Sequence, residues 1–329
     1  MRLARLVAFA SLLAATFSAW AGPPVARHVA ADARWYVHLD MQALRKTDLF
    51  NPLKDMIRER VPLDEWLLAL QEHLGFNPLD DIDAVTLYST VFEEGRGCAI
   101  VYARVDQANL TDLLALNPGY ARVAHGNHLV HSWKDERGKT PACAFVDART
   151  VVIADGADSV RAALDVLDGK AKADSELVRG FAAGILLHGG AVRLGELAGR
   201  PESQMLSNLE SLDLSVRIRD GKVLTQLVAQ APTAERAAII RRMLLGLQAL
   251  VQLDDSKHSP EVVELVSAIE VAGEGQQITL SIEKEPGPLL DLVGAMIDRQ
   301  TQGERPRPKA TPTPKATPGR PAAPAGEDL

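Results

Sequence analysis

The sequence LDLSVRIRDGKVLTQLVAQ, residues 212–230, reads as two β-strands joined by a tight turn, and residues 231–253 follow as a long helix. Apolar and polar side chains alternate along the first strand, which is the two-residue period of a half-buried strand. The apolar members of this strand are Leu212, Leu214, Val216 and Ile218. The rest of the chain is organised as further hairpin-plus-helix units of the same kind.

The dipeptide Asp220-Gly221 predicts the turn of this hairpin, because a type I′ turn needs a positive φ at both central residues. A two-residue turn places Arg219 opposite Lys222 and Ile218 opposite Val223. Carried along the ladder, this register puts the apolar side chains of both strands on the same face of the sheet.

Pro232 is expected to open the following helix, since its fixed φ suits the first helical turn. Six apolar residues then recur at helical spacing and predict a stripe that lies on the apolar face of the sheet. They are Ile240, Met243, Leu244, Leu247, Leu250 and Val251.

The charge of the chain is acidic, with a formal net charge of −7 over 329 residues. Without the two arginines in residues 1–21 the charge becomes −9, and the tail from Gly303 carries five basic and three acidic residues, so the body is near −11. An acidic body argues against binding nucleic acid, whose affinity comes largely from neutralised phosphates. It argues equally against docking on anionic lipid.

The N-terminus, residues 1–21, has the features of a signal peptide. Arg2 and Arg5 precede a mostly apolar run at 6–17, and Ala19-Trp20-Ala21 has the small-x-small pattern of a cleavage site. As a helix the apolar run would rise about 18 Å, too short for a hydrocarbon core of about 30 Å, which disfavours an uncleaved anchor. We therefore expect export to the periplasm or the extracellular space, as a protein that is soluble after cleavage and has no membrane insertion.

The pattern of elements predicts an α+β fold of two tandem halves, 33–170 and 184–300, after a lead at 22–32 and joined by a connector at 171–183. Residues 35–38 with Leu44 resemble residues 186–188 with Leu194 in element order, which suggests an internal duplication. Hairpins make both sheets mainly antiparallel, with helices packed on one face. Whether the sheets merge edge to edge cannot be read from the pattern, although a merger would protect open edges.

The C-terminal segment, residues 301–329, is rich in proline and lacks large apolar residues until Leu329. Such a composition cannot form a core and predicts a disordered, extended spacer. The tail is either a docking arm for a partner or a passive extension.

Cys98 and Cys143 are the two cysteines of the chain. Export permits a disulfide between them, and closing that loop would add roughly 4 kcal/mol on the chain-entropy model. The alternative is two buried small side chains that never meet. Two cysteines without a CxxC motif do not suggest redox catalysis.

The histidines offer two arrangements to weigh as ligand sites. His125, His128 and His131 span a turn and a strand, so that at most His125 and His131 could converge. His38 and His188 occupy equivalent strand ends, which would fit a ligand shared by the two halves, but duplicated ancestry explains them as well. In both cases packed or solvent-facing histidines are the favoured alternative.

Asp80, Asp81 and Asp83 form an acidic cluster before a strand. A calcium loop would need more oxygen ligands at regular offsets, so turn and strand-start capping is the favoured interpretation. The sequence contains no nucleophile elbow, zinc-protease motif, phosphate loop or dinucleotide motif. It therefore predicts no catalytic, cofactor-binding or metal-ligating residue and no cofactor.

A signal peptide, an opening strand at 33–40, repeated hairpins and helices and a proline-rich tail occur together here. In this combination the chain resembles secreted bacterial proteins known as domains of unknown function. The resemblance implies an envelope or extracellular location and carries no functional residues across.

Three functions remain open. The first is a non-catalytic binding or scaffold protein that engages another envelope protein or polymer. The second is an exported hydrolase or other enzyme with a site at the junction of the two halves, which requires a deep cleft with close titratable groups. The third is a carrier of an apolar ligand, held between helices and sheet. The sequence gives no oligomeric state.

Overall fold

The computed structural model describes residues 26–60, 67–68, 70–72, 75–93, 95–178, 181, 184–198, 206–253, 260–291 and 294. The predicted signal peptide at 1–21 and the predicted tail at 301–329 lie outside the described residues. No helix in the described part of the chain is long and apolar enough to cross a membrane.

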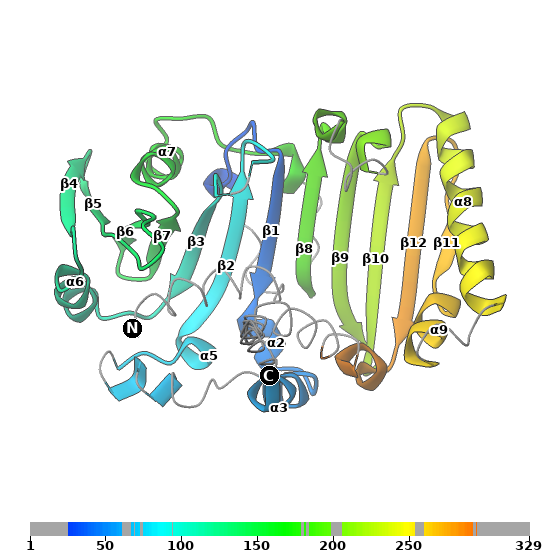
Figure 1. Cartoon of the computed structure of the whole chain (residues 1–329), viewed down its shortest axis with the longest axis horizontal. Coiled ribbons are helices and arrows are strands. Elements are labelled where there is room, and N and C mark those ends of the chain that lie inside the picture. The colour runs from blue at the N-terminus through cyan, green and yellow to red at the C-terminus, as the bar shows by residue number, and fades with distance from the viewer. Residues whose placement is uncertain are drawn as a thin grey trace, which may run out of the picture.

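The strands in this part of the chain form one 12-stranded sheet in the order β11-β12-β10-β9-β8-β1-β2-β3-β7-β6-β5-β4 (Figure 1), and every neighbouring pair is antiparallel. The strands are β1 (Trp35–Asp40), β2 (Ile82–Ser89), β3 (Cys98–Ala103), β4 (Ala121–His125), β5 (His128–Ser132), β6 (Ala142–Asp147), β7 (Thr150–Ala154), β8 (Ile185–Val192), β9 (Ser211–Arg219), β10 (Lys222–Gln230), β11 (Glu270–Ala272) and β12 (Gln277–Lys284). With the helices below, they confirm the α+β fold class.

Helices connect the strands and cover parts of both sheet faces. The α-helices are α2 (Met41–Arg45), α3 (Phe50–Arg60), α5 (Pro78–Asp81), α6 (Gln107–Ala115), α7 (Ala157–Leu167), α8 (Ala234–Leu253) and α9 (Pro260–Ser267). The 3₁₀ turns are η1 (Ala26–His28), η2 (Glu176–Val178), η3 (Leu194–Leu197) and η5 (Leu206–Asn208).

The hairpin of β9 and β10 has the predicted register. Asp220 and Gly221 have φ angles of 54° and 75°, as a type I′ turn requires. Arg219 pairs with Lys222, and Ile218 pairs with Val223. The local turn chemistry therefore fixed this part of the sheet.

The two predicted halves merge edge to edge through β1 and β8, the strands that open them. These strands pair antiparallel at the centre of the sheet, with His38 directly opposite His188. The merger leaves β4 and β11 as the outer strands (Figure 1). The arrangement that protects strand edges, which the sequence only favoured, is the one observed.

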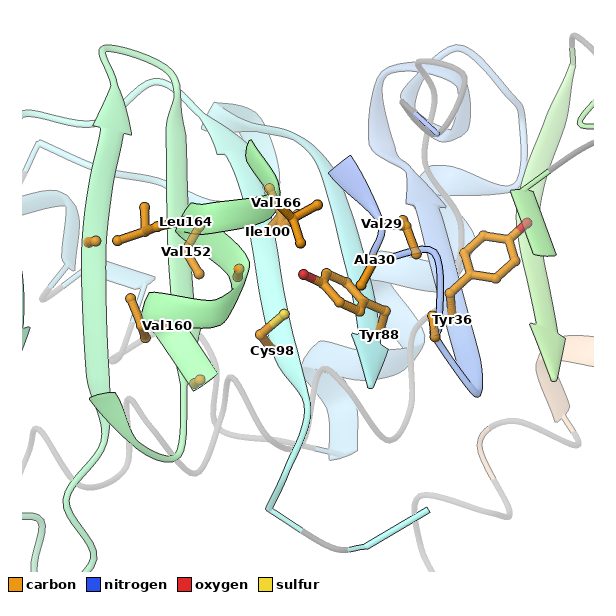
Figure 2. Packing of buried hydrophobic residues seen from close by; sticks show 14 of the residues in the cluster. Val29, Ala30, Tyr36, Tyr88, Cys98, Ile100, Val152, Val160, Leu164 and Val166 are labelled. Atoms are coloured by element: carbon orange, nitrogen blue, oxygen red, sulfur yellow. The ribbon is translucent and has the colours of Figure 1, made fainter. Parts of the chain in front are cut away.

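One face of the first half carries the main core, and we call it the α7 face. Val160 and Leu164 of α7 are fully buried against Ile100 of β3 and Val152 of β7, as Figure 2 shows. Tyr36 of β1 joins this core at the junction. Since cross-strand partners share a face, the same face continues across β8 into the second half.

The opposite face, which we call the α2 face, is covered in both halves. Met41 and Leu44 of α2 pack against Leu187 of β8 and against Leu214 and Val216 of β9. In the first half Leu114 of α6 packs there, in a cluster with the buried residues Trp133, Cys143 and Val151. The described helices thus cover both faces of the first half, whereas the sequence predicted one covered face.

Helix α8 differs from the prediction at its start and in its packed face. It begins at Ala234 rather than Pro232, because the Thr233 hydroxyl accepts a hydrogen bond from the Arg236 amide at 3.2 Å and caps the helix. Ile240 and Leu244 pack with the sheet as predicted. Three other members of the predicted stripe, Met243, Leu247 and Leu250, are about half exposed, with exposed fractions of 51%, 49% and 62%.

Candidate functional site at the junction of the two halves

The junction of the halves places two histidines side by side on the α7 face. His38 of β1 and His188 of β8 are directly opposite in the ladder, so their imidazoles project from the same face. Both are buried, with exposed fractions of 1% and 3%. Buried histidines need hydrogen-bond partners, and these partners define the site.

His188 links the core to the surface through two partners. The Tyr36 hydroxyl contacts Nδ1 of His188, and Asp213 Oδ2 lies 3.1 Å from Nε2. An ionised carboxylate only accepts hydrogen bonds, so Asp213 favours the tautomer of His188 that carries its proton on Nε2. In that tautomer Nδ1 accepts the hydrogen bond of the Tyr36 hydroxyl, so the imidazole lies between the buried tyrosine and the Asp213 carboxylate.

The strand opposite Tyr36 makes room for this contact. Gly190 is the cross-strand partner of Tyr36, and a Cβ added there would lie 3.1 Å from Cε1 of the Tyr36 ring and 3.2 Å from Cδ2 of Leu177. A glycine therefore lets the tyrosine ring lie close to β8. In Figure 2 the Tyr36 hydroxyl points away from the α7 core, toward the neighbouring strand.

His38 is held from the other side. Its Nδ1 lies 2.8 Å from Oγ1 of Thr86, the residue directly opposite on β2. Phe181 meets both imidazoles edge-on, with ring centroids 5.9 Å from His38 and 5.3 Å from His188. The pair of imidazoles is thus enclosed by protein side chains from four segments.

Asp40, at the end of β1, lies two residues beyond His38 on the same face and is fully buried. Its Oδ1 accepts a hydrogen bond from the Ala43 amide at 2.6 Å and caps α2. Among the described residues, its Oδ2 has no hydrogen-bond partner. Burial raises the pKa of this carboxyl from 3.8 to about 6, against the lowering effects of the Ala43 amide, Lys46 and Arg45.

A row of polar residues runs from this site into the second half. His188 faces Ser215 of β9, Ser215 faces Gln226 of β10, and Gln226 faces Ser281 of β12. The row is buried at Thr86 and at the two histidines, and half-buried from Ser215 onward. The junction is therefore the inner end of a polar surface on the α7 face.

The other three predicted histidines do not converge in the way the sequence allowed. The two-residue turn pairs His125 with His128, so these two share a face and His131 points to the other side. The expectation that at most His125 and His131 could converge is wrong for this reason.

Each of the three has its own partner. His125 lies 2.8 Å from Asp165, His128 lies 2.8 Å from Asp168, and His131 lies 2.8 Å from the Tyr120 hydroxyl. Burial, with Arg122 nearby, lowers the pKa of His131. Within the described ranges, no group of three or more histidine, cysteine or acidic side chains is placed to hold a metal ion.

The acidic cluster before β2 is engaged in caps and ion pairs. Asp80 accepts a hydrogen bond from the Asn77 side chain, and Asp81 accepts one from the Asn77 amide at 2.7 Å. Asp83 contacts Arg45 at 3.4 Å and also pairs with Arg149. This is the capping arrangement that the sequence favoured over a calcium loop.

Cys98 and Cys143 are both buried and both free in this structure. Cys98 lies on β3 opposite Tyr88, in the α7 core, whereas Cys143 lies on β6 in the cluster on the α2 face. Burial raises the pKa of each thiol to about 12. The alternative of two buried side chains that do not meet describes this arrangement.

No protein-family model matches the chain, and no curated protein matches it in sequence. Solved structures with a similar fold include crystal form III of TP0453, with a TM-score of 0.49, and crystal form IV, with a TM-score of 0.46. Both are 12% identical in sequence and cover 84% of this chain and 98% of the other. A likeness at this level carries no argument about function.

Proposed function

We propose that this chain is an exported, non-catalytic binding or scaffold protein that engages another envelope protein or polymer through the α7 face of its second half. The observation that supports the proposal is that this face is only partly buried. Its residues on β9, β10 and β12, which we call the open face, are all half-buried or exposed. They are Asp213, Ser215, Arg217, Leu224, Gln226, Val228, Thr279, Ser281 and Glu283.

The reverse side of the same strands explains why this face is free to bind. Val223, Ala229 and Ile278 on the α2 face are buried. An antiparallel sheet with one packed face and one solvated face is stable in water, so the open face needs no covering element for folding. Its hydroxyl and amide side chains at Ser215, Gln226 and Ser281 suit a hydrogen-bonding partner.

The junction favours binding over catalysis. The titratable groups expected for an enzyme are present at His38 and His188, but the described contacts of their ring nitrogens are to Thr86, Tyr36 and Asp213. The two halves meet here through a continuous β-ladder. A general base needs a ring nitrogen within reach of the substrate proton, whereas these nitrogens face protein groups.

A cross-linking pull-down from the host envelope tests the proposal, using the intact chain, the Gln226→Arg variant and a chain lacking residues 303–329. Gln71→Arg is the matched control, because Gln71 is an exposed glutamine in the first half. We expect a specific partner that Gln226→Arg loses and Gln71→Arg keeps. If the partner is lost only from the chain that lacks residues 303–329, the binding site lies in the tail. A turnover activity that one point mutation abolishes would refute the non-catalytic assignment.

A further inference from the structure

Helix α8 carries an apolar stripe on the side that does not pack against the sheet. This outer stripe consists of Ile239 (49% exposed), Met243 (51%), Leu247 (49%), Leu250 (62%) and Leu253 (82%). The helix lies beside β11 and β12 at one end of the sheet (Figure 1). Exposed apolar residues gathered on one face mark an interaction site more often than scattered ones do.

Four residues of the outer stripe, together with Gly246, have the spacing of a helix–helix seam. Ile239, Met243, Gly246, Leu250 and Leu253 follow one another at intervals of four, three, four and three residues. This alternation is the spacing of positions that face a second helix in a coiled coil. The two ends of the seam, Ile239 and Leu253, each lie seven residues from Gly246.

Gly246 is the second, independent observation. It stands in the interior of α8, where glycine is unfavourable relative to alanine. A Cβ added to it would meet nothing within 4 Å, so the packing described for the chain itself does not require a glycine. A glycine at the centre of an apolar seam allows two helix backbones to approach closely.

Two arginines of α8 donate hydrogen bonds to backbone carbonyls. Arg241 donates to the Gln277 carbonyl at 2.6 Å, and Arg242 donates to the Ala238 carbonyl at 3.3 Å. The five residues of the outer stripe expose on the order of 500 Å² of side-chain surface, a large part of the about 800 Å² per partner that a stable interface buries.

From these observations we infer that the outer stripe of α8 is a dimer interface, and that its occupant is the same stripe of a second copy, antiparallel and related by a two-fold axis at Gly246. A two-fold axis there places Ile239 against Leu253 of the second copy. A two-fold interface uses the same surface patch of both copies, as this arrangement does. Two sheets would then lie end to end, with both open faces available to partners.

The test is analytical ultracentrifugation of the full chain, purified from the exporting host, across a range of concentrations. We expect a reversible dimer, whose dissociation constant rises roughly 100-fold in Leu250→Glu because a buried leucine is replaced by a charge. Leu116→Glu is the matched control, since Leu116 is an 81% exposed leucine just after α6. That variant should dimerise as the wild type does.

Two further variants examine the geometry. Gly246→Cys should form an intermolecular disulfide on mild oxidation, because the two copies meet at this residue, while Leu253→Cys should not. Gly246→Leu should weaken the dimer by blocking close approach, although it adds apolar surface. A chain that stays monomeric at about 100 µM overturns the inference. The inference is also overturned if the chain is a monomer that co-sediments with phosphatidylcholine vesicles and Leu250→Glu abolishes that co-sedimentation.

Discussion

The buried carboxyl of Asp40 predicts an unusual pH dependence of stability. The folded chain holds the Asp40 proton up to about pH 6, whereas the unfolded chain releases it near 3.8. Between these values the folded state binds more protons, so the free energy of unfolding falls as pH rises. The contribution is fully present below pH 3.8 and is lost as pH passes through 6.

Its size follows from the pKa, since one pKa unit corresponds to about 1.4 kcal/mol. Raising the pKa from 3.8 to about 6 therefore costs about 3 kcal/mol of stability once the carboxyl is ionised. Asp40→Asn keeps an amide oxygen to cap α2 and removes the titration. We expect the variant to match the wild type near pH 4 and to exceed it by up to about 3 kcal/mol at pH 7.

Urea unfolding followed by circular dichroism at pH 4, 5, 6 and 7 measures this difference. Asp106→Asn is the matched control, because Asp106 caps α6 in the same way but is exposed. It should show no such gain with rising pH. If the Asp40→Asn and wild-type curves stay parallel from pH 4 to pH 7, the burial argument for Asp40 is refuted.

Three further predictions concern the junction, the thiols and the core. Tyr36→Phe should lower the free energy of unfolding by about 1–3 kcal/mol, because it leaves Nδ1 of the buried His188 without a hydrogen-bond donor. Asp213→Ala should lower it by less, because Asp213 is half exposed. Equal losses of stability in urea unfolding would contradict the described burial. Cys98 and Cys143 should resist a thiol reagent at pH 8 and react together on unfolding, since burial raises the pKa of each thiol to about 12. A protein whose mass is lower by two hydrogen atoms and that has no free thiol after unfolding would instead contain a disulfide. Leu164→Ala should lower the free energy of unfolding by about 2–5 kcal/mol, because this side chain is fully buried. Leu250→Ala should change the stability of a monomer little, because Leu250 is exposed. Similar losses in the two variants would contradict the packed face assigned to each helix.

Local chemistry made the hairpin of β9 and β10 predictable. Asp220-Gly221 dictates the turn, and the turn sets the register of both strands. The caps at Asp40 and Asp106 could be read for the same reason, because a cap depends on residues within one helical turn.

Long-range pairing set the rest of the fold. The contact of β1 with β8 brings His38 and His188 together across 150 residues, and no local pattern contains it. The partners Tyr36, Thr86 and Asp213 were missed as site residues for the same reason. A signal was present in Gly189-Gly190, where two small residues in a strand indicate close approach of another side chain.

The face of α8 could not be predicted because it is apolar on two sides. Periodicity shows which residues share a helix face, but it does not say which of two apolar stripes packs on the sheet. The structure selects Ile240 and Leu244 for the sheet and leaves Met243 and Leu250 outward. The histidine spacing failed in a similar way, because a two-residue turn pairs His125 with His128 instead of preserving the alternation of one strand.

Photo-cross-linking in the living host tests the binding proposal most directly. A photoreactive amino acid would be placed at Gln226 on the open face and, as a control, at Gln71 in the first half. The account predicts a discrete, saturable adduct from position 226 and none from position 71. Equal, diffuse labelling at both positions, or an adduct from position 71 alone, would contradict the assignment of the open face as the binding surface.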